Sequence, residues 1–185
     1  MIEQLNKWDH ELFVYLNSLG IESYDAFWIF VTNFKHWIPL YLFFFIMVFV
    51  VFHWKKAILN SIFLLVSFTA TMGFTFLVKT MSLRLRPNNQ PELQDLIRIL
   101  QNPTNYSFFS GHASGSFVVA TFVVLCIKEK HKWIYAIYIW PILFVMSRIY
   151  VGVHYPSDLM AGTLVGILFA HIFYRLSLRA GNKFY

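Results

Sequence analysis

Residues 57–78 of the sequence read AILNSIFLLVSFTATMGFTFLV, a run of 22 residues that contains no charged side chain. An α-helix needs roughly 20 apolar residues to cross the hydrocarbon core of a bilayer, which is about 30 Å thick. Four other stretches are also predominantly apolar, namely residues 37–52, 113–127, 133–151 and 159–176. We therefore predict five transmembrane helices. The apolar segment 24–34 is too short to cross alone, but as a bent extension of the first span it would make a sixth crossing.

The composition of the chain indicates the same class of protein. Hydrophobic residues make up 58% of the chain and charged residues only 13%, whereas soluble domains carry about 25% charged residues. These figures exclude a disordered chain, and the single cysteine, Cys126, excludes an internal disulfide. The net charge of +6 suits anionic lipid headgroups. Nucleic acid is not an expected partner, because the basic residues are scattered between apolar runs.

We predict an all-α, polytopic membrane helix bundle that forms a single domain over residues 1–185. Residues 1–36 would form an N-terminal interfacial region, and residues 37–177 the transmembrane catalytic core. Amphipathic interfacial helices are expected near residues 8–19 and at residues 90–101. The second of these would lie on the membrane or act as a lid over a site, because its apolar residues share one helical face, namely Leu93, Leu96, Ile97 and Leu100.

The last predicted span contains a pair of glycines, Gly162 and Gly166, in a G-x-x-x-G pattern. Such a pair lets another helix approach closely. We expect the partner helix to belong to the same chain. The sequence does not indicate an oligomeric state.

The distribution of basic residues sets the expected orientation. One face carries eight of them, from the turns 54–56 and 128–132 and from the C-terminal tail, and the other face carries seven. Three of those seven, Lys79, Arg86 and Arg148, are assigned below to a site, which leaves eight against four. Because cytoplasmic loops are enriched in Lys and Arg, we expect the tail in the cytoplasm and the loop 80–110 outside.

Several polar residues gather at the outer ends of the predicted spans, where ionisable groups are costly and usually functional. Three cations in one place repel one another and lose hydration unless an anion lies between them. Arginine binds phosphate oxygens through a planar fork of N–H groups, and lysine supplies a point charge. A helix N-terminus adds free N–H groups. The cluster therefore predicts a phosphate site, and its members are Lys79, Arg86, Ser110, Gly111, His112, Arg148, His154 and Asp158.

Two histidines and a carboxylate in this cluster suggest nucleophilic chemistry. One histidine can attack phosphorus while a second protonates the leaving oxygen. The attacking ring must be neutral, with its tautomer fixed by a carboxylate, and Asp158 lies four residues after His154, in the first turn of a helix that begins at Pro156. A metal site made of His112, His154 and Asp158 is the alternative. Because three cations would repel a divalent ion, we expect no metal and no cofactor.

Three motifs now stand out in order: Lys79-TMSLRL-Arg86-Pro87, Ser110-Gly111-His112 and Ser147-Arg148-IYVGV-His154-YPS-Asp158. They resemble the signature of the type 2 phosphatidic acid phosphatases, membrane enzymes related to vanadium-dependent haloperoxidases and bacterial acid phosphatases. The resemblance covers about residues 57–176. It implies an all-helical bundle that removes a terminal phosphate from a lipid without a metal ion. Phe109 stands where the family usually has proline, which bears on the geometry of that loop more than on the chemistry.

The resemblance also implies a role for each residue. His154 would be the nucleophile that forms a phosphohistidine, oriented by Asp158, and His112 the general acid for the leaving group and then the base for water. The phosphate would be bound by Lys79, Arg86 and Arg148, with help from Ser110 and the Gly111 backbone. Two further cations of the outer loop, Arg84 and Arg98, would either hold a second phosphate or, as we favour, be solvated or lipid-facing.

We interpret the chain as an integral membrane lipid phosphatase whose site faces the periplasm or exterior across a bacterial-type inner membrane. The first candidate substrate is a polyprenyl diphosphate, and the alternatives are phosphatidylglycerophosphate, phosphatidic acid and a lipid A phosphate. The expected partners are this phosphorylated lipid and the surrounding membrane lipids. Two other functions fit the pattern: a lipid phosphotransferase that uses the same site, and a non-catalytic phospholipid transporter or binding protein.

Overall fold

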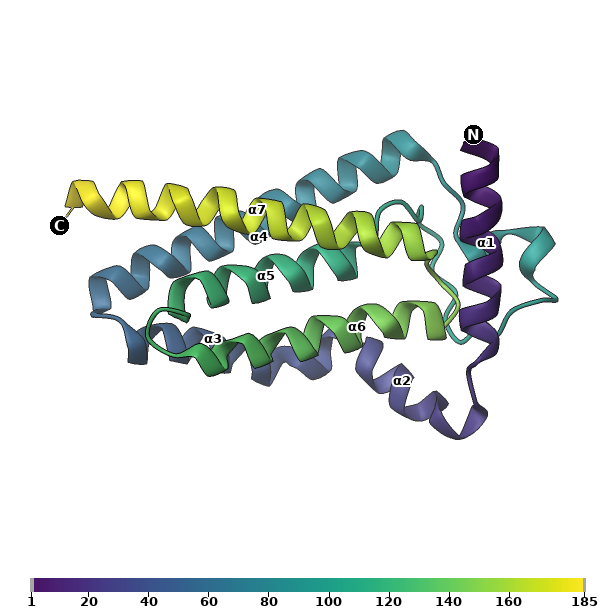
Figure 1. Cartoon of the computed structure of the whole chain (residues 1–185), viewed down its shortest axis with the longest axis horizontal. Coiled ribbons are helices and arrows are strands. Elements are labelled where there is room, and N and C mark those ends of the chain that lie inside the picture. Colours follow the sequence, from purple (N-terminus) through teal and green to yellow (C-terminus); the bar gives the residue numbers. More distant parts are fainter. Residues whose placement is uncertain (1, 185) are drawn as a thin grey trace.

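A computed structural model of the chain describes residues 2–184, and over these residues every regular element is a helix. Figure 1 shows a bundle of roughly parallel and antiparallel helices that is crossed at one end by the N-terminal helix. The α-helices are α1 (Ile2–Ser18), α2 (Asp25–Thr32), α3 (Ile38–Val51), α4 (Trp54–Ser82), α5 (Gly111–Ile127), α6 (Ile139–Tyr150) and α7 (Pro156–Phe184). Short 3-10 helices lie at Glu22–Tyr24, Phe34–Trp37, Pro87–Asn89, Pro91–Leu93 and Lys132–Tyr138.

The five predicted spans correspond to α3 through α7. Four helical stretches are long and apolar enough to cross a membrane, and α5 is a shorter apolar helix. The segment that might have formed a sixth crossing contains only α2, whose eight residues reach about 12 Å. Asn33, in an extended conformation, separates α2 from the helix that follows. The chain is an integral membrane protein with five spans, and α2 does not form a sixth.

Two prolines lie at the starts of spans. Pro39 is in the first turn of α3, where a missing N–H costs nothing. Pro141 is in the first turns of α6, which continues from the 3-10 helix Lys132–Tyr138. The predicted span 133–151 is therefore built from two kinds of helix.

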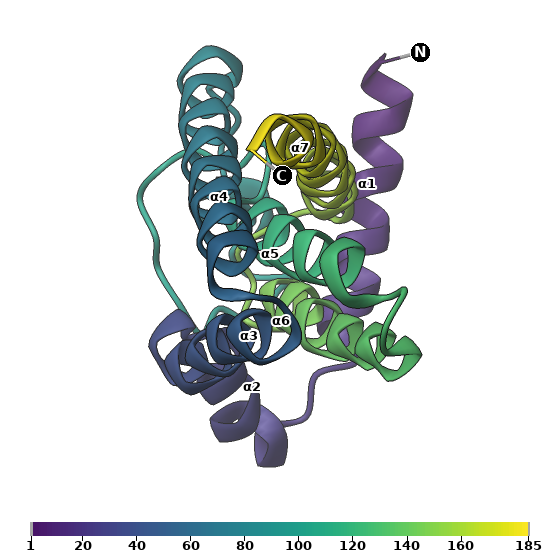
Figure 2. The ribbon, with the colours of Figure 1, turned by 90° about the vertical axis from the view of Figure 1, so that its left-hand side faces the viewer.

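Helix α5 lies at the centre of the bundle, surrounded by α3, α4, α6 and α7 (Figure 2). All of its residues from Ala113 to Ile127 are buried. Because neighbouring helices cover it on every side, α5 tolerates small and polar residues such as Ser114, Ser116 and Thr121 that a lipid-facing helix would expose to hydrocarbon.

The two glycines of the G-x-x-x-G pair let α7 pack directly on the backbone of α5. A Cβ added at Gly162 would lie 2.6 Å from the carbonyl oxygen of Ser110, and one at Gly166 would lie 2.5 Å from that of Ser114. No side chain fits in this space. The expectation that the pair packs against a helix of the same chain is confirmed.

Helix α1 presents two different faces. Leu5, Trp8, Leu12, Tyr15 and Leu19 form an exposed apolar stripe, as expected for a helix that lies on a membrane surface. On the other face Phe13 and Asn17 are fully buried. The side-chain amide of Asn17 donates to the carbonyl oxygens of Arg98, Ile149 and Tyr150.

The prediction of an amphipathic helix at residues 90–101 is wrong. Only Pro91–Leu93 form a 3-10 turn, and the backbone that follows is bonded to other elements. Asn17 Oδ1 accepts from the backbone N–H of Arg98 at 2.7 Å, and the N–H of Leu100 donates to Val151 at 3.1 Å. Gly152, at φ +81°, lets the carbonyl oxygen of Arg98 approach closely. A Cβ added at Gly152 would lie only 2.4 Å from that oxygen. These long-range contacts take the hydrogen bonds that a local helix would need.

The packing of α7 on α5 predicts unequal costs for two glycine substitutions. Gly166→Ala should lower stability by about 1–3 kcal/mol, because its methyl group would overlap the backbone of α5. Gly73→Ala is the control: a Cβ there meets nothing within 4 Å, so it should be neutral or slightly stabilising. Thermal unfolding midpoints in detergent measure both, and equal midpoints would contradict the proposed contact.

Candidate active site

The structure brings the predicted site residues to the end of the bundle that α1 crosses, where the helix ends meet in Figure 1. Charge–charge interactions join the members of the cluster, since Lys79, Arg86 and Arg148 all act on both histidines. The positions are as follows: Lys79 near the end of α4, Arg86 in the loop after it, Ser110 to His112 at the start of α5, Arg148 near the end of α6, His154 in the α6–α7 turn and Asp158 in the first turn of α7.

The contacts of His154 define its tautomer. Its Nε2 lies 2.9 Å from Nη1 of Arg86, and because a guanidinium carries no acceptor, Nε2 must accept. Its Nδ1 lies 3.2 Å from Oδ2 of Asp158 and donates to it. The proton therefore sits on Nδ1 and the lone pair on Nε2. Burial lowers the pKa of His154 well below its usual value, and the neighbouring cations lower it further, so the ring is neutral.

Asp158 is the most heavily bonded side chain of the site. Besides His154, its Oδ2 accepts from Ser107 Oγ at 2.5 Å and from the backbone N–H of Tyr155 at 3.0 Å. Its Oδ1 accepts from Nη1 of Arg84 at 2.8 Å. The bond to Tyr155 also satisfies a donor at the start of α7, as an acidic residue in the third position of a helix commonly does. Four donors thus fix both oxygens of a carboxylate that is 0% exposed.

Arg86 is held in place by the loop that faces it. Its Nε donates to the carbonyl oxygen of Asn105 at 2.7 Å, and its Nη2 donates to Asn105 Oδ1 at 2.9 Å. Its Nη1 is shared between the carbonyl oxygen of Val153 and His154. The guanidinium is buried and aligned beside the nitrogen that carries the lone pair of His154.

Lys79 and Arg148 are also buried, and each retains bonding capacity. Lys79 Nζ donates to the carbonyl oxygens of Tyr106 and Ser107 at 2.6 and 2.7 Å, which leaves one of its three donors. Arg148 Nη1 donates to Thr32 Oγ1 and to Gln101 Oε1. Its Nε is buried, and within residues 2–184 it has no hydrogen-bond partner. Such an orphaned donor is costly unless a ligand accepts from it.

The start of α5 supplies a helix N-terminus and the second histidine. Ser110 is the N-cap: its Oγ accepts from the N–H of Ala113, and its own N–H donates to the carbonyl oxygen of Asp158 at 3.0 Å. The ring of His112 is partly exposed and lies 4.9 Å from that of Phe144. Within residues 2–184 no hydrogen bond involves the ring of His112, so its two nitrogens have no protein partner, and charge–charge interactions relate it to Arg148, His154, Arg86 and Lys79.

The structure gives Arg84 and Arg98 acidic partners that neither interpretation included. Arg84 is bonded to Asp9 and Asp158, and Arg98 to both carboxylate oxygens of Asp25 at 2.7 Å. Acidic residues of the N-terminal region pair with both cations, whose side chains remain 21% and 30% exposed. The pairing engages donors that a second phosphate would need. No spacing in the sequence links residues so far apart.

Several residues that contact the predicted cluster were not predicted from the sequence. Ser107 is the most important, because it bridges Asp158 and His154. In the sequence its only signal was its position, a serine among aromatic residues in a predicted loop. The other missed contacts come from Thr32, Gln101 and Asn105, whose sequence surroundings are unremarkable.

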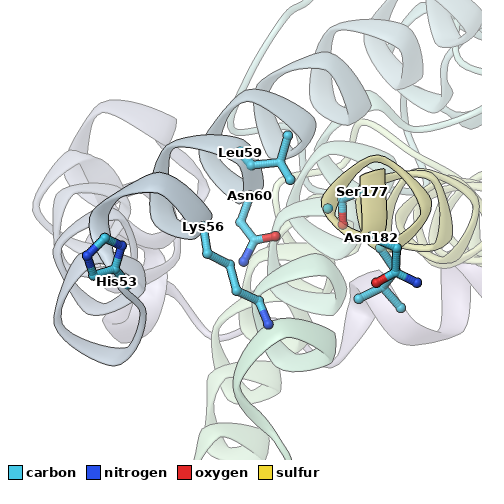
Figure 3. Close-up of a pocket in the computed structure, with 8 residues that line it drawn as sticks. His53, Lys56, Leu59, Asn60, Ser177 and Asn182 are labelled. Carbon is cyan, nitrogen blue, oxygen red and sulfur yellow. The ribbon is translucent and has the colours of Figure 1, made fainter. Parts of the chain in front are cut away.

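Two further findings concern other kinds of site. Among residues 2–184, no group of three or more His, Cys, Asp or Glu side chains is arranged to hold a metal ion. A cavity of about 390 Å³ lies between the start of α4 and the end of α7 (Figure 3), and Lys56, Asn60 and Asn182 help to line it. It is at the opposite end of these helices from Lys79 and Asp158, so it is separate from the predicted site.

This fold and this arrangement of motifs define a known class of membrane protein. The chain belongs to the PAP2 superfamily, whose sequence profile matches residues 60–181. The family expected from the three motifs is therefore confirmed, and so is the all-helical membrane fold.

Individual relatives are similar over most of the chain. It is 32% identical to the lipid A 4′-phosphatase of Bacteroides thetaiotaomicron, over 94% of this chain and 79% of that protein. It is 31% identical to the undecaprenyl-diphosphatase of Sulfolobus acidocaldarius, over 84% of this chain and 72% of that protein. The crystal structure of a transmembrane PAP2-type phosphatidylglycerolphosphate phosphatase from Bacillus subtilis matches with a TM-score of 0.76 at 17% identity, over 95% of this chain and 87% of that one. This last similarity shows the shared fold.

The hydrogen bonds of His154 predict its NMR signature. At about pH 6.5, where an unperturbed histidine is half protonated, the ring should be neutral, with its proton on Nδ1. Nitrogen-15 spectra of histidine-labelled protein in micelles would show this, and the resonance is assigned by its loss in His154→Asn. A protonated ring, or a neutral ring with the proton on Nε2, would contradict the arrangement described above.

Proposed function

We propose that this protein is a lipid phosphatase that removes a terminal phosphate from a membrane lipid, without a metal ion, through a phosphohistidine on His154. The observation that carries the proposal is the neutral ring of His154 among three buried cations, Lys79, Arg86 and Arg148. Asp158 places one negative charge beside these residues. The three cations and one carboxylate therefore leave a net positive charge. A phosphate would supply that charge and also accept from the orphaned Nε of Arg148.

Binding of the phosphate would change the contacts of one residue in particular. In this structure Arg86 donates to Nε2 of His154, so the lone pair that must attack is engaged. A phosphate placed between the cations would draw the Arg86 guanidinium toward its oxygens, since a charged acceptor forms a stronger bond than a neutral ring nitrogen. Substrate binding would thus release the nucleophile.

The chemical steps then follow from the positions of the two histidines. Nε2 of His154 attacks phosphorus, and the bond between phosphorus and the leaving oxygen breaks while His112 gives that oxygen a proton. His112 would take up this proton when the bound phosphate offsets the charges of the three cations. The new imidazolium keeps its Nδ1 proton and is stabilised by Asp158. Water, deprotonated by His112, next attacks phosphorus, and the P–N bond breaks to release phosphate. The three cations and the Ser110–Gly111 helix N-terminus would stabilise the charge on phosphorus in both steps.

The substrate class is proposed from the relatives and from the fate of two arginines. Similar proteins are named as a lipid A 4′-phosphatase and an undecaprenyl-diphosphatase. Arg84 and Arg98, the two cations suited to a second phosphate, are paired with carboxylates. We therefore place a lipid carrying one accessible phosphate, such as lipid A 4′-phosphate, ahead of a polyprenyl diphosphate. With the lysine-rich turns in the cytoplasm, the site would face the periplasm or exterior of an inner membrane.

The first test is phosphate release from a lipid panel by purified protein in chelator, with His154→Ala alongside. The panel holds lipid A 4′-phosphate, a polyprenyl diphosphate, phosphatidylglycerophosphate and phosphatidic acid. The wild type should release phosphate from one of them, and His154→Ala should lose at least about 10³-fold in rate. The matched control is His171→Ala on the exposed side of α7, which should retain activity. Full activity of His154→Ala, or no release from any lipid, would contradict the proposal.

Two reagents test the mechanism separately. Vanadate, which adopts the geometry of pentacoordinate phosphorus, should inhibit, and Arg148→Gln should weaken that inhibition because it removes the orphaned donor. Chelator should leave the rate unchanged. A rate lost in chelator and restored by a divalent ion would instead support a metal mechanism.

A further inference from the structure

Arg84 joins the N-terminal helix to the carboxylate of the site. Its Nη1 donates to Asp158 Oδ1 and to Ser157 Oγ, both at 2.8 Å. Its Nη2 donates to Asp9 Oδ2 of α1 at 2.7 Å. The guanidinium carbon lies 4.1 Å from the ring centroid of Tyr155, a stacking distance. A planar fork thus bridges two carboxylates from opposite ends of the chain.

Asp9 also caps the start of α7. Its Oδ1 accepts from the backbone N–H of Ser157 at 2.9 Å, and its Oδ2 from the hydroxyl of Ser157 at 2.5 Å. The first N–H groups of a helix have no partner within the helix, and an acidic group there is favoured by the helix dipole. Asp9 therefore fixes the turn of α7 that carries Asp158, in addition to holding Arg84.

From these contacts we infer that Arg84 and Asp9 are positioning residues for the nucleophile, so that α1 is part of the catalytic assembly. Arg84 holds Oδ1 of Asp158, which leaves Oδ2 turned toward Nδ1 of His154. Neither residue touches the attacking nitrogen. The inference rests on the proposed function of His154 and adds to it two residues that have no assigned role in the motifs. Arg84 lies in the stretch between Lys79 and Arg86 of the first motif, and Asp9 lies outside all three motifs.

The contacts of Arg84 favour this role over substrate binding. Its two terminal nitrogens already donate to carboxylates, and its side chain is only 21% exposed. Without it, Oδ1 of Asp158 would be a buried acceptor that has lost a charged donor. The carboxylate would then be held through Oδ2 alone, and the ring of His154 would lose part of the support that fixes its orientation.

Arg84 also acts on His154 through its charge. It is one of the cations that keep the pKa of His154 low, together with Arg86, Arg148 and Lys79. Removing a positive charge favours the protonated ring, so the pKa of His154 should rise in Arg84→Gln. Only the neutral ring attacks. As the pH is lowered, the variant should therefore begin to lose activity at a higher pH than the wild type does. The charged and titratable groups that face His154 are Lys79, Arg84, Arg86, His112, Arg148 and Asp158.

The experiment compares Arg84→Gln and Asp9→Asn with Arg98→Gln. Arg98 is a matched control, because it also links the outer loop to the N-terminal region, through Asp25 at 2.7 Å, but it does not contact Asp158. Arg84→Gln should lower kcat by about 10- to 100-fold, as expected when a catalytic group is misplaced, with little change in KM. The acid limb of kcat/KM should move to higher pH. Arg84→Lys, which cannot bridge both carboxylates with a planar fork, should recover only part of the rate.

Several outcomes would overturn the inference. Equal losses in Arg84→Gln and Arg98→Gln would show a merely structural tether, and a raised KM at unchanged kcat would show a substrate contact. The nitrogen-15 signal of His154 provides a readout that does not need the lipid substrate. If no lipid is hydrolysed, the proposed function fails, yet the positioning role still requires Arg84→Gln to alter the tautomer or pKa of His154. An unchanged His154 signal in that variant would refute it.

Discussion

The carboxylate of Asp158 is the group on which the site depends. It accepts from a loop serine, from His154, from the backbone at the start of α7 and from Arg84. The carbonyl oxygen of the same residue accepts from Ser110, the cap of α5. A buried charge is tolerated only when its bonds are complete, so these separate segments must all be in place together. One residue therefore fixes the relative positions of His154, the N-terminal end of α5 and the N-terminal helix.

The bundle provides the rigid frame that this bonding requires. Gly162 and Gly166 bring α7 into backbone contact with α5, so the first turns of these helices have little freedom to shift relative to each other. The cations come from α4, from α6 and from the loop after α4. Because like charges repel, they stay together only while packed helices and backbone carbonyls hold them, as in the two carbonyl contacts of Lys79. Helix packing thus supplies the preorganisation that electrostatic stabilisation of a phosphate needs.

Features that depend on a local pattern could be predicted from the sequence. Apolar runs marked the five spans, and the fixed spacing between His154 and Asp158 indicated their pairing, which the structure contains at 3.2 Å. Residues 90–101 have a helical apolar pattern, but Asn17 and Val151 take their backbone hydrogen bonds. The partnership of Arg84 with Asp9 spans 75 positions and leaves no periodic trace. Local signals predicted the members of the candidate site, and long-range hydrogen bonds determine how those residues are supported.

The complete enclosure of α5 has a consequence for how the protein is made. This helix is synthesised before α6 and α7, yet those two helices provide much of its cover. Its serines and threonine would therefore enter the bilayer before the two helices that later cover them have been synthesised. The nascent α5 has to be retained beside α4, where Ser114 finds Thr75 at 3.0 Å, until α7 emerges. The candidate site can therefore be complete only after the final helix has been made, because α7 both covers α5 and carries Asp158.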